Sequence, residues 1–199
     1  MRSMLLVSLV VLVAAACGDD TEPAAFAGFE RVPAPVVADV DLPQVDADGN
    51  ETPFVFRAVD DGVLLVYFGY TSCPDVCPTT LSDVRSALAD VGDDAERVDL
   101  AMVTIDPDRD TPDVLTGYVE FFLEGSSAVR TTDDPSLRAA ADVFGVDYGV
   151  ETTADGEIEV FHTGSLYAVD DAGALVLTWP FGVPADDLAA DLDRLLEDT

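Results

Sequence analysis

The sequence predicts an α/β fold in which helices cover a parallel central β-sheet, with one β-hairpin near each end of the folded part. Three observations predict it. Residues 63–69 and 97–105 are apolar runs rich in β-branched side chains, which is typical of strands buried on both faces. Segments with apolar residues at helical spacing alternate with these strands. Turn residues separate short, alternating apolar pieces toward both ends.

The first 17 residues predict an export signal. Arg2 precedes an uncharged run, residues 5–16, which is shorter than the roughly 20 apolar residues that span a bilayer. Small residues directly before Cys17 resemble the lipobox of bacterial lipoproteins, in which the cysteine is lipidated, although Ala14 stands where leucine is usual. Cleavage that leaves a free Cys17, or an uncleaved anchor, are the alternatives. All three place the folded part outside the cytoplasm, and lipidation would anchor it to the outer face of the cell membrane.

Residues 18–35 are rich in Asp, Glu, Pro and Ala and predict a flexible, solvated tether. Residues 36–199 show no repeat and no internal boundary, so they predict one domain. Within it, residues 40–56 contain an Asp-Gly-Asn turn signal between short alternating pieces, which predicts the N-terminal hairpin.

Three helices are expected in the middle of the domain. Residues 79–91 follow the first buried strand and carry apolar side chains at helical spacing. A second helix opens at Thr111 after the second buried strand, and a third runs to Phe144 with Asp134 or Ser136 as its cap.

The last part of the domain predicts two strands, residues 158–169 and 174–179, joined by an Asp-Asp-Ala-Gly turn. Leucines at helical spacing from Leu188 to Leu196 then predict a closing amphipathic helix. The order is hairpin, β, α, β, α, α, ββ, α, which is the arrangement of a thioredoxin-like fold with insertions.

The charge of the chain is unusual. Forty acidic residues face nine basic ones, all arginine, and the formal net charge is −31. Such a surface repels phosphate groups, so the composition excludes nucleic-acid binding. The acidity fits a cation-attracting surface, but adaptation to salt or a compositional bias is favoured, because total charge bears on solubility and association and not on chemistry.

Two cysteines carry the main chemical signal. Cys73 and Cys77 lie between the first buried strand and the following helix, where an α/β sheet presents its ligands. A helix N-terminus stabilises a thiolate there. Three intervening residues let both sulfurs converge on one point. The spacing alone leaves a metal site, a redox dithiol and a structural disulfide open.

His162 is the only histidine in the chain. It is placed near the carboxyl edge of the predicted sheet, so it could approach the cysteine loop. Two thiolates and one imidazole would form a soft donor set that suits Cu(I) and accepts Cu(II). A histidine that only satisfies a core or surface position is the alternative.

Three longer segments resemble the Sco/SenC family of copper proteins. They are residues 67–81 around the cysteines, residues 104–112 with their Asp-Pro-Asp-Arg-Asp-Thr-Pro run, and residues 161–163 before the late hairpin. They occur in the family's order and spacing over most of residues 40–197. The resemblance implies one copper ion bound by Cys73, Cys77 and His162, and a role in assembling the dinuclear copper centre of cytochrome c oxidase. It implies as partners the copper-centre subunit of the oxidase and a protein that donates copper.

Four further residues are expected to support this site. Asp75 lies between the cysteines, whereas Asp106, Arg109 and Asp110 follow the neighbouring strand at the same edge of the sheet. Charged hydrogen bonds from these three could hold the site loops, with Asp110 or Thr111 also capping the next helix.

Two other functions compete with copper delivery. The cysteine pair could act as a thiol–disulfide oxidoreductase, and a peroxidase of the peroxiredoxin type shares the fold. Thioredoxin-type enzymes resemble one another in a C-x-x-C pair and a facing cis-proline, whereas this chain has C-x-x-x-C and His162 in the region of that proline. A binding protein without turnover is therefore favoured over an enzyme.

Overall fold

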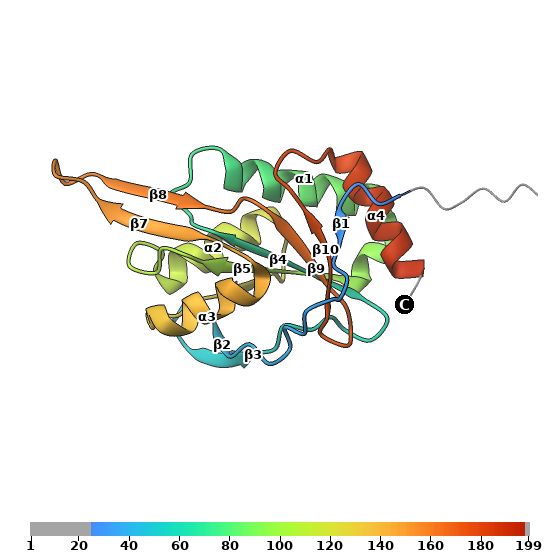
Figure 1. The fold of residues 1–199 in the computed structure, drawn as a ribbon, viewed down its shortest axis with the longest axis horizontal. Helices are drawn as coiled ribbons and strands as arrows, with labels where there is room; N and C mark the ends of the chain where they lie inside the picture. The colour runs from blue at the N-terminus through green and yellow to red at the C-terminus, as the bar shows by residue number, and fades with distance from the viewer. Residues whose placement is uncertain (1–24, 198–199) are drawn as a thin grey trace, which may run out of the picture.

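An eight-stranded sheet runs through residues 25–197, the part of the chain that the computed structural model describes (Figure 1). In spatial order its strands are β1 (Phe29–Glu30), β10 (Leu175–Trp179), β9 (Leu166–Val169), β4 (Val63–Gly69), β5 (Val98–Thr104), β6 (Ser127–Val129), β2 (Leu42–Val45) and β3 (Glu51–Phe54). The central β4, β5 and β6 are parallel, and the flanking strands pair antiparallel. The predicted thioredoxin-like α/β class is confirmed.

The central strands form where the sequence predicts them. All seven residues of β4 are buried, because helices cover both faces of the sheet at this point. Its register with β5 pairs Gly69 with Thr104, so both parallel strands end at the same level. The loops that follow them, which carry the predicted site residues, therefore start side by side.

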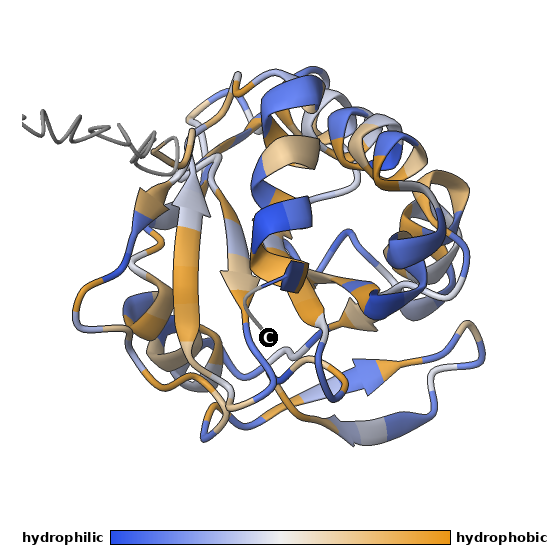
Figure 2. Ribbon diagram, turned by 90° about the vertical axis from the view of Figure 1, so that its right-hand side faces the viewer, coloured by the Kyte–Doolittle hydropathy of each residue, from blue (hydrophilic) through white to orange (hydrophobic). Residues whose placement is uncertain are grey.

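Within the described residues, four helices pack on this sheet. They are α1 (Val76–Val91), α2 (Pro112–Phe122), α3 (Asp134–Phe144) and α4 (Ala185–Glu197). Figure 1 shows α1 and α4 on one face of the sheet and α3 on the other. In Figure 2 the central strands are coloured as hydrophobic, whereas the helices carry hydrophilic stretches. A 3₁₀ turn, η1 (Gly92–Arg97), connects α1 to β5.

The helix boundaries differ from the predictions in detail. The first helix begins at Val76, three residues before the predicted start, which places Cys77 in its first turn. For α3 the cap is Asp133, whose carboxylate accepts a hydrogen bond from the Ser136 N–H at 3.0 Å. Thr111 stands at the cap position of α2, but its hydroxyl donates to Asp113 and caps no backbone group.

The predicted strand 158–169 is two strands. Its first half is β8 (Ile158–His162), which pairs antiparallel with β7 (Tyr148–Thr152) in a separate sheet, and its second half is β9. The chain changes direction between them, through residues 163–165. Figure 1 shows the β7–β8 hairpin projecting from the body at one end. The late hairpin of β9 and β10 has the predicted turn but belongs to the main sheet.

The described part of the expected tether is bound to the domain. Within residues 25–35, β1 pairs with β10, and the N–H groups of Ala27 and Gly28 donate to the Asp191 carboxylate at 3.1 and 2.9 Å. Asp191 also accepts from the Trp179 indole N–H at 2.8 Å. Phe29 and Glu30 thus form a short edge strand inside the segment whose charged and proline-rich composition predicts a tether.

The predicted export signal and Cys17 lie outside the described residues. Among residues 25–197, no helix combines the length and the apolar character needed to cross a bilayer.

Replacing Asp191 with alanine is expected to lower the free energy of unfolding by about 2–4 kcal/mol. The substitution removes the acceptor of three hydrogen bonds and leaves the buried Trp179 N–H without a partner. Urea unfolding followed by the fluorescence of Trp179, the single tryptophan, measures this. Asp193→Ala, an exposed position on the same helix, is the control and should change stability by less than about 0.5 kcal/mol. Equal stabilities would contradict the role of Asp191.

Candidate metal centre

The structure brings the three predicted ligands together. The Sγ atoms of Cys73 and Cys77 and one ring nitrogen of His162 all lie within 4.8 Å of one another. The distance between Cys77 Sγ and His162 Nε2 is 3.5 Å. Residues separated by 85 positions in the chain thus present two sulfur atoms and one nitrogen to a common point.

The cysteine loop owes its shape to the end of β4 and the start of α1. The Cys73 N–H donates to the Tyr70 carbonyl at 3.3 Å, which closes a turn directly after the strand. The Cys77 N–H, one of the free donors of the first helical turn, then donates to Cys73 Sγ at 3.3 Å. Cys77 is fully buried, whereas Cys73 is partly exposed.

His162 is the last residue of β8 and is oriented by its own backbone. Its Nδ1 lies 3.0 Å from the Thr163 carbonyl oxygen, which can only accept, so the proton resides on Nδ1. Nε2 then offers its lone pair to the cysteines. Burial lowers the pKa of His162, against the opposing effect of the Thr163 bond, and so favours the neutral, ligating form.

The two thiols are inequivalent. Burial raises the pKa of Cys73, but hydrogen bonds from the Cys77 thiol and from the backbone of Cys77 and Asp75 outweigh it, so its net pKa is lowered. Burial, together with the bond to Cys73, raises the pKa of Cys77 to about 12. Cys73 is therefore the accessible and more acidic thiol, and Cys77 is the buried and less acidic one.

Aromatic rings and one glycine shape the space around the ligands. Tyr67 and Tyr70 present their rings edge-on to the imidazole of His162, with centroids 6.1 and 5.8 Å away. A Cβ atom on Gly69 would lie 2.6 Å from Tyr67 Cε1 and 3.1 Å from Cys77 Sγ. Only glycine therefore lets the ring and the sulfur approach this closely.

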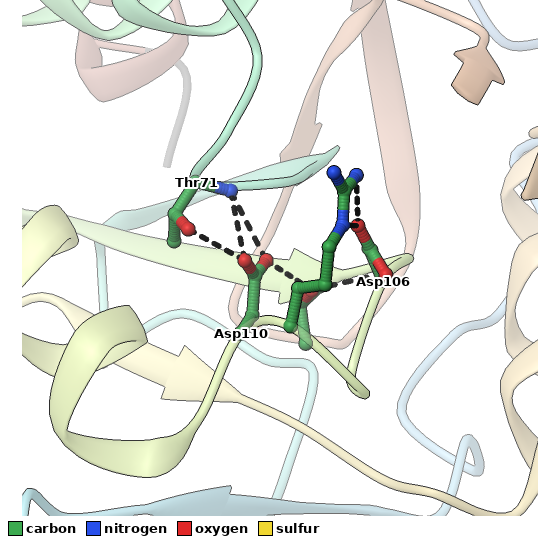
Figure 3. Close-up of polar contacts among 5 residues, drawn as sticks. Thr71, Asp106 and Asp110 are labelled. Carbon is green, nitrogen blue, oxygen red and sulfur yellow. Dashed lines mark hydrogen bonds and ion pairs between the residues drawn. The ribbon is translucent and has the colours of Figure 1, made fainter. Parts of the chain in front are cut away.

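Asp110 connects two segments at the site through hydrogen bonds. Its fully buried carboxylate accepts from the Thr71 N–H at 3.1 Å and from the hydroxyls of Thr71 and Thr104 at 2.5 and 2.6 Å. Figure 3 shows Thr71 and Asp110 facing each other across this contact. Asp110 thus ties the loop before Cys73 to the end of β5, and it does not cap the following helix.

Asp106 and Arg109 form an ion pair beside the site (Figure 3). Asp106 is buried, and the guanidinium of Arg109 also stands 5.7 Å from the centroid of Tyr70. Because Tyr70 packs edge-on against His162, the ion pair supports a ring that contacts a candidate ligand.

Asp75 does not join the ligand group. It occupies the position before α1, it is exposed, and its carboxylate makes no hydrogen bond to any residue in the described range. Its contribution is the backbone N–H that lowers the pKa of Cys73. The expectation of a tuning carboxylate at this position has no contact in the structure to support it.

Several residues around the site escaped the sequence reasoning. Thr71 and Thr104 stand inside the recognised motifs, but only the fold shows that both donate to Asp110. A cleft of about 350 Å³ opens beside the ligands. It is lined by Tyr70, Cys73, Pro74, Asp75, Val76, Val160, Phe161, His162, Gly164 and Phe181. Phe161 precedes the predicted ligand His162 within a recognised segment, whereas Phe181 comes from a segment for which the sequence offered no signal of function.

The donor set decides which ions fit. Thiolate sulfur and neutral imidazole are soft to intermediate ligands that select copper or zinc over magnesium and calcium. Three donors with a cleft on one side leave a position open for a further ligand. Such an open, three-ligand centre is suited to exchange of its ion.

Comparison with known proteins gives consistent matches. A sequence profile described as SCO1/SenC matches residues 45–197. A protein of Stutzerimonas stutzeri whose name refers to copper binding is 32% identical over 136 residues, which cover 67% of this chain and 66% of that protein, just under two-thirds of its length.

Two solved structures match closely in fold. The solution structure of apo Sco1 from Thermus thermophilus is 32% identical with a TM-score of 0.71, covering 86% of this chain and 97% of that one. ScoI of Bradyrhizobium japonicum, solved with copper bound, is 28% identical with a TM-score of 0.63, covering 78% of this chain and 97% of that one.

Asp110→Ala is expected to destabilise the domain by about 2–4 kcal/mol and to loosen the cysteine loop. The change removes the shared acceptor of Thr71 and Thr104 and leaves buried donors without a partner. Urea unfolding gives the free energy, and amide exchange at Thr71 reports on the loop. Asp108→Ala, an exposed neighbour, should leave both unchanged. Unaltered exchange at Thr71 in Asp110→Ala would refute the role assigned to the carboxylate.

In the reduced, metal-free protein, iodoacetamide is expected to modify Cys73 before Cys77. The thiolate is the nucleophile, so the lowered pKa of Cys73 makes it reactive from a lower pH, whereas Cys77 stays a thiol until the pH approaches about 12. Timed alkylation between pH 6 and 9, followed by peptide mass spectrometry, separates the two cysteines. Faster labelling of Cys77 would show that the inequivalence is wrong.

Proposed function

The chain belongs to the SCO1/SenC family, and from that premise we propose that it binds one copper ion and assists assembly of the dinuclear copper centre of cytochrome c oxidase. The observation that carries the proposal is the convergence of two sulfurs and one imidazole nitrogen within 4.8 Å. The copper-bound state of the related Bradyrhizobium protein supports copper as the ion.

Cys73, Cys77 and His162 are the proposed ligands. Both cysteines must lose a proton to bind, whereas the pKa of His162 is already lowered, so capture releases protons mainly from sulfur. A copper ion bound to both sulfurs would offset the desolvation cost of a thiolate at the buried Cys77. Acidic surroundings outside the site attract the cation without competing as ligands, because carboxylates are harder donors.

Transfer of copper to an acceptor is consistent with the unequal exposure of the three ligands. Cys77 is buried and holds its place in α1, whereas Cys73 and His162 border the cleft. An acceptor that enters the cleft with a sulfur or imidazole ligand can share the ion with Cys73 before taking it over. We propose the copper-centre subunit of the oxidase as this acceptor and a separate copper-binding protein as the donor, as the family resemblance implies.

Reduction of the acceptor's cysteines is the second candidate function. Cys73 is accessible with a lowered pKa, and Cys77 is adjacent to it, as in a redox dithiol. The Cys73 thiolate would attack a protein disulfide and form a mixed disulfide, releasing one thiolate of the acceptor. Cys77, after losing its proton, would attack Cys73 Sγ and release the second, so two electrons pass to the acceptor and a Cys73–Cys77 disulfide forms.

We also propose an exported protein held at the outer face of the membrane, with Cys17 as the lipidated residue. The support is the charged start, the short apolar run and the small residues before the cysteine. An anchor would keep the domain near a membrane-bound oxidase, which suits either candidate function.

Anaerobic titration of the reduced domain, residues 18–199, is expected to show one tightly bound copper. The Cu(II) form should show sulfur-to-copper charge-transfer absorption. Cys73→Ala, Cys77→Ala and His162→Ala should each weaken binding by more than the roughly 10- to 100-fold that loss of an outer-shell contact costs. Asp75→Asn is the control and should bind like the parent protein, since Asp75 stands outside the ligand group.

Two results would redirect the proposal. Tight binding that survives His162→Ala would remove the histidine from the ligand set and leave a dithiol site. Absence of tight copper binding, with retained reduction of a protein disulfide by the Cys73–Cys77 pair, would replace copper delivery with the reductase function.

A further inference from the structure

The outer edge of β8 has unpaired backbone groups. Hydrogen bonds join Thr163 to Asp147 and Thr153 to Glu157, which fixes the alternation along the hairpin. Between these two bonds, the backbone N–H and C=O groups of the odd-numbered residues of β8 point toward β7. The N–H and C=O groups of Ile158, Val160 and His162 therefore point away from β7, and they have no hydrogen-bond partner among residues 25–197.

The opposite edge of the hairpin is occupied at Tyr148, the residue paired with His162. The Arg138 side chain of α3 reaches the outward Tyr148 carbonyl at 3.4 Å, and its guanidinium stacks 4.4 Å from the centroid of the Tyr148 ring. The Tyr148 hydroxyl also donates to Asp134 at 3.2 Å. At the end of the hairpin that borders the metal centre, a side chain therefore occupies the β7 edge, and the β8 edge is the one open to an added strand.

The β8 edge borders the metal centre. Val160, Phe161 and His162 form one wall of the 350 Å³ cleft, and the cysteine loop forms the facing wall. The rim is apolar and exposed: Phe161 is 54% and Phe181 is 47% accessible. An edge strand with exposed apolar side chains is a template for pairing with another chain.

The negative charge of the β7–β8 hairpin favours a positively charged segment as the binding partner of β8. Residues 147–163 contain five acidic residues and no lysine or arginine. Glu151 and Glu159 stand directly opposite each other, and neither has an ion-pair partner in the described part of the chain. Like charges in this position repel. A second copy of the hairpin would add to the repulsion, whereas a cationic segment would relieve it.

We propose that β8 binds an extended, positively charged segment of the copper-exchange partner by β-strand addition, placing a sulfur ligand of that segment opposite His162. This inference rests on the proposed copper exchange and names how the partner reaches the centre. Paired residues on adjacent strands lie about 5 Å apart and project to the same face. The partner residue opposite His162 therefore points, like the imidazole, toward Cys73 and Cys77.

The register also predicts the pattern of the partner. Residues opposite Ile158, Val160 and His162 face the centre, so they are apolar or carry sulfur. Residues between them face the side of Glu159 and Glu151, where lysine or arginine fits. The partner segment thus alternates apolar and basic side chains, with methionine or cysteine at the end that reaches His162.

The test uses the full, reduced, copper-free chain and a synthetic peptide of alternating valine and lysine with one methionine. The peptide is expected to slow amide exchange at Ile158, Val160 and His162, with an affinity that falls as salt rises. Val160→Pro removes one outward N–H without breaking a bond of the hairpin, and should weaken binding at least about tenfold. Val150→Pro, its cross-strand neighbour on β7, is the matched control and should bind normally.

A charge variant tests the electrostatic part of the proposal, and separate titrations distinguish peptide binding from copper binding. Glu159→Gln should weaken binding roughly threefold and flatten its salt dependence. Equal affinity of Val160→Pro and wild type, protection of β7 instead of β8, or peptide-free dimerisation through β8 would each overturn the proposal. Copper binding is titrated separately on every variant. Protection of β8 in a chain that binds no copper would uphold this docking edge while rejecting the proposed function.

Discussion

The buried carboxylate of Asp110 is the contact on which the site depends. The parallel register of β4 and β5 makes both strands end at one level, but loops that leave a sheet edge together can diverge. Asp110 prevents this, because it accepts from Thr71 in one loop and from Thr104 at the end of the other strand. A buried carboxylate needs such donors to offset its desolvation. The hydrogen bonds that offset the desolvation of Asp110 therefore also fix the loop that carries Cys73.

Next to that fixed loop, the two thiols differ in burial, and therefore in pKa and in accessibility. Cys77 lies in the first turn of α1 against Tyr67 and Gly69, where desolvation raises its pKa. Cys73, four residues earlier, receives hydrogen bonds and faces the cleft. One sulfur is thereby held rigidly by the core, and the other is open to an incoming ligand or disulfide. Copper delivery and thiol reduction both use this division, which is why one geometry supports both candidate functions.

The sequence allowed the fold and the ligands to be predicted where the signal was local. The buried run of β4 and the cysteine spacing are local patterns, and the residues around His162 carried a family resemblance. The β7–β8 sheet was missed, because its exposed residues lack a clear alternation and the strand break at residues 163–165 has no strong turn signal. The anchoring of residues 25–35 by Asp191 is a contact over 160 positions, which no local pattern contains.

The hairpin that the sequence did not reveal carries the third ligand. His162 belongs to a two-stranded sheet outside the main sheet, and an isolated hairpin of two strands has marginal stability in water. It is held to the body by Arg138 against Tyr148 and by the rings of Tyr67 and Tyr70 against His162. A third strand on β8 would satisfy the open backbone groups and stabilise the whole hairpin. Docking of a partner and the fixing of His162 beside the cysteines are then coupled, since both depend on the same two strands.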